Sequence, residues 1–272
     1  MNLANVKLVV TDMDGTLLNS NHEVSDKFLS LFKKLKSHGV LFVAASGRAL
    51  YSIEEKLYAI KDDIIIVAEN GGLVIKDNEI VSSVAIENKN VFLIDDILKT
   101  LPNANALYCT KNAAYTSSTS EPLLKLLSEY YNNYQIVESV HDVTDPIYKI
   151  AIYHEISSEK YVYPKVQHLE SDFKVKVSAN HWVDISENDA NKGHAIQLLQ
   201  KLLQITPEET MVFGDYNNDI EMLQSAYFSY AMENAHPFVK ETARFLTKNN
   251  DSLGVESVLE ELIKAKEVNI HS

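Results

Sequence analysis

The sequence predicts an α/β protein in which a mostly parallel sheet is covered by helices and interrupted by an inserted α+β module. Three observations support this fold class. Short apolar runs alternate with amphipathic helical segments near the N-terminus, and polar clusters directly follow four of the predicted strands. The alternation is lost after about residue 82 and resumes near 187. We therefore expect a discontinuous core of residues 1–82 and 187–272, with the inserted module at 83–186.

The N-terminal segments set the parallel order. The run "VKLVVT" (6–11) is short, apolar and β-branched, which is typical of a strand buried on both faces. Residues 25–39 have the pattern of an amphipathic helix, with Ser25 as its cap and Gly39 at its end. Strands are predicted at 40–46 and 63–70, with a helix at 50–60 between them. This β-α-β-α-β order favours a parallel sheet.

The rest of the chain divides into the module and the return to the core. A hairpin is predicted at 72–86 around Asp77-Asn78. In the module, helices are expected near 89–100, 120–131 and 157–168, and strands near 105–109, 113–117, 148–153, 174–178 and 182–185. The core then resumes with a helix at 191–205, a strand at 210–215, a helix opening in "NDIEMLQSA", a strand at 227–232 and a helix at 251–266.

Composition narrows the classes of function. The chain has 272 residues, of which 46% are hydrophobic and 23% charged, as in packed globular proteins. A net charge of −13 disfavours binding to nucleic acid or anionic membranes, but still permits a local site for a small anion. The single Cys109 excludes an intramolecular disulfide and a cysteine-based metal site. With no apolar run of about 20 residues, we expect a soluble, cytoplasmic protein; the oligomeric state is not predicted.

The polar clusters at the strand ends are "TDMDGT", "ASGR", "ENGG" and "GDYNND". Each alone is compatible with ordinary turn chemistry. Ligands of open parallel sheets bind beyond the carboxyl ends of the strands, so the four clusters together predict one site. Asp12, Asp14, Asp215 and Asp219 would then meet at one edge, where like charges need a counterion.

A magnesium ion is the counterion that the residue types favour. Mg²⁺ prefers carboxylates, waters and phosphate oxygens. Asp12 and Asp215 each directly end a predicted strand, and the backbone carbonyl of Asp14 can add a third ligand. The lack of a nearby cysteine or histidine pair argues against zinc.

A phosphate group explains the remaining polar residues. Ser46 and the amides of Gly47 and Arg48 lie at a strand end that opens a helix, a setting that favours anions. Lys192 begins the helix after the module and supplies a positive charge, although a solvated lysine is the ordinary alternative.

These parts suit phosphoryl transfer to a carboxylate. Asp12 can attack the phosphorus and form an aspartyl-phosphate, with the metal and Lys192 neutralising the phosphate oxygens. Asp14, two residues on and on the same side of an extended chain, can give a proton to the leaving alkoxide and later take one from water.

The motifs resemble those of the haloacid dehalogenase superfamily. "DMDGT" (12–16), "SGR" (46–48), Lys192-Gly193 and "GDYNND" (214–219) look like its four signature motifs. "ENGG" (69–72), the position of the module and "AMENA" (231–235) resemble the Cof-type subfamily of sugar-phosphate phosphatases. The resemblance covers essentially the whole chain and implies a Rossmann-like core with an inserted α+β cap that closes over the leaving group.

The resemblance also implies a role for each matching residue. Asp12 would be the nucleophile and Asp14 the general acid and base. The other roles are phosphoryl binding by Ser46, Gly47, Lys192 and Asn218, Mg²⁺ binding by Asp12, the Asp14 carbonyl and Asp215, and support from Arg48 and Asp219. The expected substrates are small phosphorylated metabolites, in particular hexose phosphates.

Two other functions remain open on the sequence. A phosphosugar mutase or phosphotransferase would use the same nucleophile but pass the phosphoryl group back to a sugar. A non-catalytic ligand-binding protein would be expected to lack the nucleophile or the lysine, and both are present. The sequence does not identify the phosphate ester or the cap residues that select it.

Overall fold

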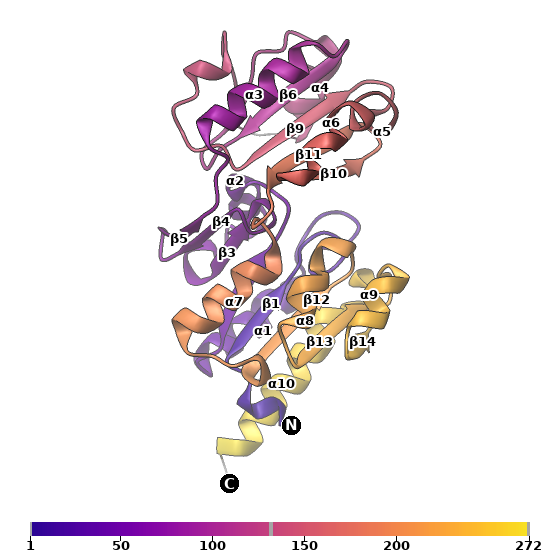
Figure 1. Ribbon diagram of the computed structural model, residues 1–272. Helices are drawn as coiled ribbons and strands as arrows, with labels where there is room; N and C mark the ends of the chain where they lie inside the picture. The colour runs from indigo at the N-terminus through magenta and orange to yellow at the C-terminus, as the bar shows by residue number, and fades with distance from the viewer. Residues whose placement is uncertain (1, 131–132, 271–272) are drawn as a thin grey trace.

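A computed structural model describes residues 2–130 and 133–270. Its strands form two separate sheets, one of eight strands and one of six. Figure 1 shows the six-stranded sheet and its helices as a unit at one end of the molecule, above the larger unit that contains the eight-stranded sheet. The α/β fold with a parallel core and an inserted α+β unit, predicted from the alternation of segments, is confirmed.

The eight-stranded sheet has the order β14-β13-β12-β1-β2-β3-β4-β5. The strands from β14 to β3 are parallel to one another, and β4 and β5 continue the sheet antiparallel. Asp77 and Asn78 both adopt positive φ between β4 and β5, as a tight hairpin turn requires. The strands are β1 (Leu8–Thr11), β2 (Leu41–Ala45), β3 (Ile65–Ala68), β4 (Leu73–Lys76), β5 (Glu79–Ser83), β12 (Thr210–Gly214), β13 (Phe228–Met232) and β14 (Phe245–Thr247).

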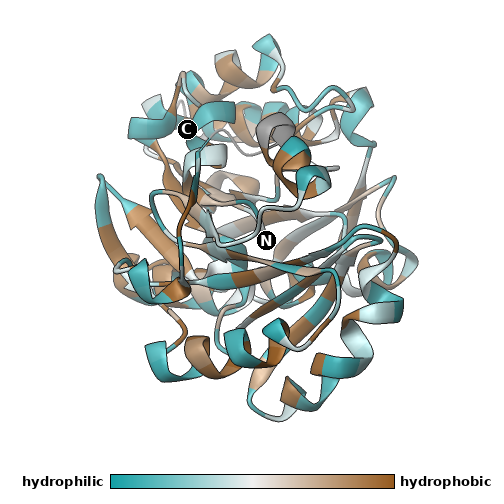
Figure 2. Ribbon diagram, turned by 90° about the horizontal axis from the view of Figure 1, so that it is seen from above, coloured by the Kyte–Doolittle hydropathy of each residue, from teal (hydrophilic) through white to brown (hydrophobic). Residues whose placement is uncertain are grey.

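Helices of this unit pack on the parallel sheet through apolar faces. The Ser25 side chain caps α1 by accepting from Phe28 N at 2.9 Å, and the helix buries Phe28, Leu31, Phe32 and Leu35. Seen from above, Figure 2 shows hydrophobic colour along parts of the strands and hydrophilic colour on many outer helical turns. The helices are α1 (Asp26–Ser37), α2 (Leu50–Lys56), α7 (Lys192–Leu203), α8 (Ile220–Gln224), α9 (Pro237–Thr242) and α10 (Gly254–Ile270).

The smaller unit contains the elements from α3 to β11 and is named the cap below; its six-stranded sheet has the order β10-β11-β9-β6-β7-β8. One of its faces packs on helices in a separate hydrophobic cluster that includes Ile150, Val166 and Val183. Its elements are α3 (Asn88–Lys99), β6 (Ala104–Cys109), β7 (Ala114–Thr116), α4 (Glu121–Tyr130), β8 (Tyr134–Ile136), β9 (Lys149–His154), α5 (Ser158–Tyr161), α6 (Tyr163–Val166), β10 (Phe173–Ala179) and β11 (Trp182–Glu187).

Some expected elements differ from the observed ones. The helix expected near 157–168 is broken into α5 and α6, with Pro164 in the first turn of α6, where its missing N–H can be tolerated. Helix α4 is described to Tyr130, and residue 131 of the expected helix lies outside the described residues. Strands β8 and β14 and helix α9 were not predicted, because each is short and lacks a strong period.

Short 3-10 turns complete the chain, and two of them shape the strand ends discussed below. These turns are Leu3–Asn5, Lys61–Asp63, Glu69–Gly71, Val140–Asp142, Gln167–Ser171, Pro207–Glu209, Asn217–Asp219 and Asn250–Ser252. In the part of the chain that the structure describes, no helix combines the length and the apolar character needed to cross a bilayer.

Candidate active site

A cavity of about 460 Å³ lies beyond the carboxyl ends of β1, β2, β3 and β12. Its lining includes side chains from all four polar clusters that follow these strands: Asp12 and Asp14, Ser46 to Arg48, Glu69, and Asp215 with Tyr216 and Asn218. The clusters lie far apart in the sequence. They meet because neighbouring parallel strands have their carboxyl ends at the same edge of the sheet. The predicted convergence on one site is therefore observed.

Lys192 and Asp219 lie beneath this cavity, and both are fully buried. Lys192 Nζ is 2.5 Å from Asp12 Oδ1 and 2.7 Å from Asp219 Oδ1. Burial alone would lower the pKa of Lys192, but the charges of Asp12 and Asp219 raise it above its ordinary value. Lys192 is thus a fixed cation joined to the nucleophile candidate, and not a solvated surface lysine.

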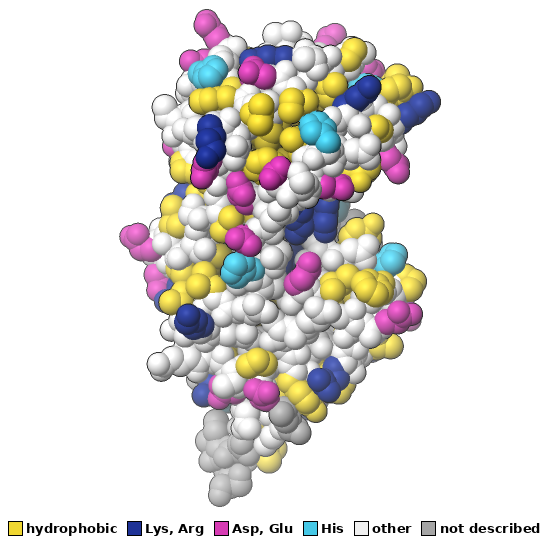
Figure 3. Space-filling model, viewed as in Figure 1, with side chains coloured by type: hydrophobic (Ala, Val, Ile, Leu, Met, Phe, Trp, Pro, Cys, Tyr) yellow, Lys and Arg dark blue, Asp and Glu magenta, His cyan; other side chains and the backbone are white. Residues whose placement is uncertain are grey.

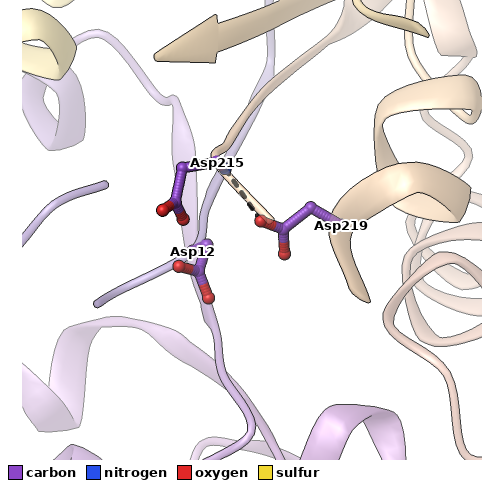
Figure 4. A group of neighbouring side chains, drawn as sticks. All are labelled: Asp12, Asp215 and Asp219. Carbon is purple, nitrogen blue, oxygen red and sulfur yellow. Dashed lines mark hydrogen bonds between the residues drawn. The ribbon is translucent and has the colours of Figure 1, made fainter. Parts of the chain in front are cut away.

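Asp219 uses both carboxylate oxygens within the protein. Oδ1 accepts from Lys192, and Oδ2 accepts from the backbone amides of Asp215 and Tyr216 at 2.9 and 3.1 Å. Figure 4 shows the bond to Asp215 as a dashed line. This arrangement fixes the loop after β12 and orients Lys192, so Asp219 supports the site from behind.

Three carboxylates gather around a point that suits a cation. Oxygens of Asp12, Asp215 and Asp219 lie within 4.8 Å of one another, as Figure 4 shows, and the cluster is found among residues 2–130 and 133–270. One lysine cannot neutralise three carboxylates. Burial, with the neighbouring acids, holds the pKa of Asp12 well above its ordinary value and raises that of Asp215 to about 6. A divalent cation would relieve this repulsion, so the residues fit Mg²⁺.

The loop after β1 is shaped to admit Asp215. Gly15 adopts a φ of +76°, and a Cβ at this position would lie 2.3 Å from Asp215 Oδ2. Thr16 Oγ1 donates to Asp215 Oδ1 at 3.1 Å. The loop therefore needs glycine at 15, both for its backbone conformation and for the space that the carboxylate occupies.

Asp14 is bound by two basic side chains in this structure. Arg48 Nε and Nη2 donate to its two oxygens, each at 2.6 Å, and His22 Nδ1 lies 3.1 Å from Oδ1. Burial would raise the pKa of Asp14, but the Arg48 hydrogen bonds and charge hold it below its ordinary value. Sequence reasoning gave Arg48 a role in the loop and did not predict this contact with Asp14.

The loop after β2 presents backbone and side-chain groups to the cavity. Ser46 is buried, and its Oγ accepts from the Arg48 amide at 3.1 Å. Asn70 lies against Gly47 and accepts from Asn218 Nδ2 at 2.9 Å. Ser46, Gly47 and Asn218 are thus brought together at the cavity wall.

The turn Glu69–Gly71 connects this loop to Lys192. Gly71 has a φ of +99°, and a Cβ there would lie 2.3 Å from the backbone oxygen of Asn191. Asn191 caps α7, since its side chain accepts from His194 N at 2.6 Å, and Lys192 is the next residue. The close approach at Gly71 therefore sets the position of the helix that carries Lys192.

Sequence reasoning did not single out Lys149, which comes from the cap but reaches the core. Its Nζ lies 2.6 Å from Glu69 Oε2 and donates to the Gly47 carbonyl at 3.2 Å. Burial raises the pKa of Glu69, and Lys149 partly opposes this shift. The position of Lys149 at the start of a predicted strand does not indicate a functional role, because its partner Glu69 lies far away in the sequence.

Comparison with known proteins gives the family. Residues 9–259 match the family described as haloacid dehalogenase-like hydrolase. The chain belongs to this family. Solved haloacid dehalogenase-like folds agree: a hydrolase from Bacteroides thetaiotaomicron has a TM-score of 0.85 at 25% identity, covering 94% of this chain and 99% of that one. A Thermotoga maritima protein has a TM-score of 0.85 at 27% identity, with coverages of 94% and 97%.

Relatives of this haloacid dehalogenase-like hydrolase have enzyme names. One is the 5-amino-6-(5-phospho-D-ribitylamino)uracil phosphatase YbjI of Escherichia coli, 32% identical, with 95% of this chain and 97% of the relative covered. Another is the phosphatase YwpJ of Bacillus subtilis, 29% identical, with 95% and 100% covered. The chain is accordingly an enzyme, a phosphatase of the haloacid dehalogenase type.

Proposed function

We propose that this phosphatase is magnesium-dependent and hydrolyses small phosphorylated metabolites, in particular sugar phosphates, through an aspartyl-phosphate on Asp12. The observation that carries the proposal is the buried contact of Lys192 with Asp12 and Asp219, beside Asp215. This contact joins Asp12, which lines the cavity together with Ser46, Gly47 and Asn218, to a fixed cation buried beneath it.

In the first step, a free carboxylate oxygen of Asp12 attacks the phosphorus of the substrate. The bond from phosphorus to the ester oxygen breaks, and the phosphoryl group is then bonded to Asp12. Lys192 on the other carboxylate oxygen fixes the orientation of the nucleophile. Ser46 and Asn218 would bind the oxygens of the phosphoryl group, a role supported by their position in the lining of the same cavity as Asp12.

Asp14 moves the proton in both steps. In its protonated form it gives a proton to the leaving alkoxide, and as the resulting carboxylate it takes a proton from the water that attacks the phosphorus. In this second step the bond from phosphorus to the Asp12 oxygen breaks, which releases inorganic phosphate and restores the Asp12 carboxylate. Arg48 holds Asp14 as a carboxylate in this structure, so the acid form requires the Arg48 contact to open. An incoming phosphate that attracts Arg48 would release Asp14 in this way.

Asp12, Asp215 and the Asp14 carbonyl would hold Mg²⁺. When bound, the metal supplies positive charge that stabilises the transferring phosphoryl group. Asp219 would not ligate the metal directly, because both of its oxygens accept hydrogen bonds from protein groups. Residues 83–186 would form the cap that covers the leaving group and excludes water.

A second substrate is favoured by the relatives. YbjI and the Bacillus subtilis protein YwtE are both named 5-amino-6-(5-phospho-D-ribitylamino)uracil phosphatase, at 32% and 25% identity to this chain. That ester also places its phosphate on a chain of hydroxyl groups. It therefore belongs beside hexose phosphates as a candidate substrate.

The test is phosphate release from p-nitrophenyl phosphate and from these esters, with Mg²⁺ and with a chelator. Asp12→Asn keeps the size of the side chain and should abolish release without unfolding the protein, as circular dichroism would check. Full activity of Asp12→Asn, or unchanged turnover in chelator, would contradict the nucleophile or the metal respectively. Isomerised sugar phosphate in place of released phosphate would indicate the mutase.

A further inference from the structure

A second cavity of about 410 Å³ lies between the cap and the core and continues the first. The two cavities share Gly47, Glu69, Lys149, Tyr216 and Asn218. The wall of the second cavity that belongs to the cap includes Lys174, Lys176 and Ser178 of β10, and Asp184 and Ser186 of β11. A leaving group attached to a phosphoryl group at Asp12 would extend into this space.

The register of the cap sheet places these polar residues on one face. In β10 the sequence "FKVKVS" alternates apolar and polar residues, and Phe173 and Val175 pack into the hydrophobic cluster of the cap. Lys174 and Lys176 point the other way, opposite Ser186 and Asp184 of β11. One face of the sheet thus packs on helices. The other face is covered by α4 over β6, β7 and β9, while its β10-β11 end presents lysines to the cavity.

The charge of this wall contrasts with the rest of the protein. The chain carries a net charge of −13, yet three lysines and only two acidic residues line this cavity. Figure 3 shows Lys and Arg side chains gathered in the hollow at the waist of the molecule. Glu69 is already paired with Lys149, which leaves Asp184 as the one other acid of the lining.

Acidic residues lie near Lys174 and Lys176, but none of the described ones contacts them directly: Asp184 lies opposite Lys176 in β11, and the charge of Glu221 acts on Lys174. Neither forms an ion pair within 4.0 Å with any described carboxylate, and Lys174 Nζ donates only a long bond of 3.4 Å to the Ala190 carbonyl. Burial and the neighbouring Lys176 lower the pKa of half-buried Lys174. A bound anion would offset the repulsion and the lost hydration of this pair.

We propose that the cap wall is a second anion subsite, in which Lys174 and Lys176 bind a carboxylate or a second phosphate at the far end of the leaving group. The inference rests on the proposed function, since it assumes that the phosphoryl group lies at Asp12. It narrows the substrate class to phosphate esters that carry a second negative charge.

The test compares substrates matched except for the distal charge. One pair is 6-phosphogluconate and glucose 6-phosphate, which tests a carboxylate. The other is fructose 1,6-bisphosphate and fructose 6-phosphate, which tests a second phosphate. The unaltered enzyme should prefer the more anionic member of at least one pair by about tenfold in kcat/KM, the scale of one charged hydrogen bond.

The variants Lys174→Met and Lys176→Met should each reduce this ratio several-fold. Lys176 is exposed, so its replacement is not expected to prevent folding even if that of Lys174 does. Lys165→Met is the matched control, because Lys165 is exposed on α6 and outside both cavities, and the ratio and the activity should stay unchanged.

The outcomes separate the two proposals. Equal kcat/KM within both pairs, or a loss in Lys176→Met that is the same for esters with and without the distal charge, overturns the subsite while the phosphatase stands. If no ester is hydrolysed, the proposed function fails, and calorimetric binding of the same four esters to the unaltered protein decides the subsite. Tighter binding of a charged member, lost in Lys176→Met, would support it.

Discussion

Replacement of Lys192 by methionine tests how much its ion pairs with Asp12 and Asp219 contribute to the stability of the protein. The side chain is fully buried and joins Asp12 and Asp219, which are themselves 6% and 0% exposed. Methionine preserves most of the volume but removes the charge. Two buried carboxylates then lose their common counterion, and breaking a buried ion pair in this way costs about 3–5 kcal/mol. We expect the free energy of unfolding to fall by about this amount near neutral pH without Mg²⁺.

The loss should depend on pH in a defined direction. Burial already raises the pKa of Asp12, and removal of Lys192 takes away the strongest effect that lowers it. The folded variant therefore takes up a proton more readily than the unfolded chain does, so the destabilisation shrinks as the pH falls and grows as it rises. Urea unfolding of the metal-free protein at several pH values measures this, with Lys201→Met as a control on the exposed surface of the same helix.

Two outcomes would refute this reasoning. Unfolding of Lys192→Met at the same urea concentration as the control at neutral pH would mean that the ion pairs contribute nothing to stability. A loss of stability that is the same at all pH values would mean that the loss comes from packing. Adding Asp219→Asn to Lys192→Met should recover part of the loss, because it removes one of the two uncompensated carboxylates.

Three further predictions follow from the same contacts. Gly71→Ala should lower the free energy of unfolding by at least about 1–3 kcal/mol, measured by urea unfolding, because the new methyl group would meet the Asn191 carbonyl. Apparent Mg²⁺ affinity, measured by calorimetry, should weaken below about pH 6, where Asp215 binds a proton in the metal-free protein; an affinity that is constant from pH 5 to 8 would contradict this. Lys149→Met should destabilise the protein at neutral pH more than Lys149→Met combined with Glu69→Gln, because the single variant leaves Glu69 buried and unpaired.

The parallel sheet and the meeting of the polar clusters at one of its edges could be predicted from the sequence, for physical reasons. Buried parallel strands are continuous apolar runs, so "VKLVVT" and its counterparts stand out. Polar residues at the ends of such strands must meet at one edge, which brings Asp12, Ser46 and Asp215 together without any knowledge of the contacts. The short β14 and the broken helix near Pro164 carry weaker periodic signals and were not predicted correctly.

The partners of individual side chains could not be predicted. Arg48 contacts Asp14 because two loops lie against each other in the folded protein. The sequence shows only that each residue follows the end of a strand. Lys149 pairs with Glu69 across the junction of cap and core. The separation of the two residues in the sequence does not indicate that their side chains meet. The alternation in "FKVKVS" did offer a signal for Lys174 and Lys176, since period-two lysines mark one face of a strand.

The central claim is that Asp12 carries the phosphoryl group during turnover. Borohydride added to the enzyme during hydrolysis of p-nitrophenyl phosphate with Mg²⁺ would reduce an aspartyl-phosphate to homoserine, which peptide mass spectrometry can locate. We predict homoserine at position 12, and none at Asp14, Asp215 or Asp219, only when substrate and Mg²⁺ are both present. Unmodified Asp12 under conditions of steady phosphate release, together with homoserine at another of these positions, would contradict the account.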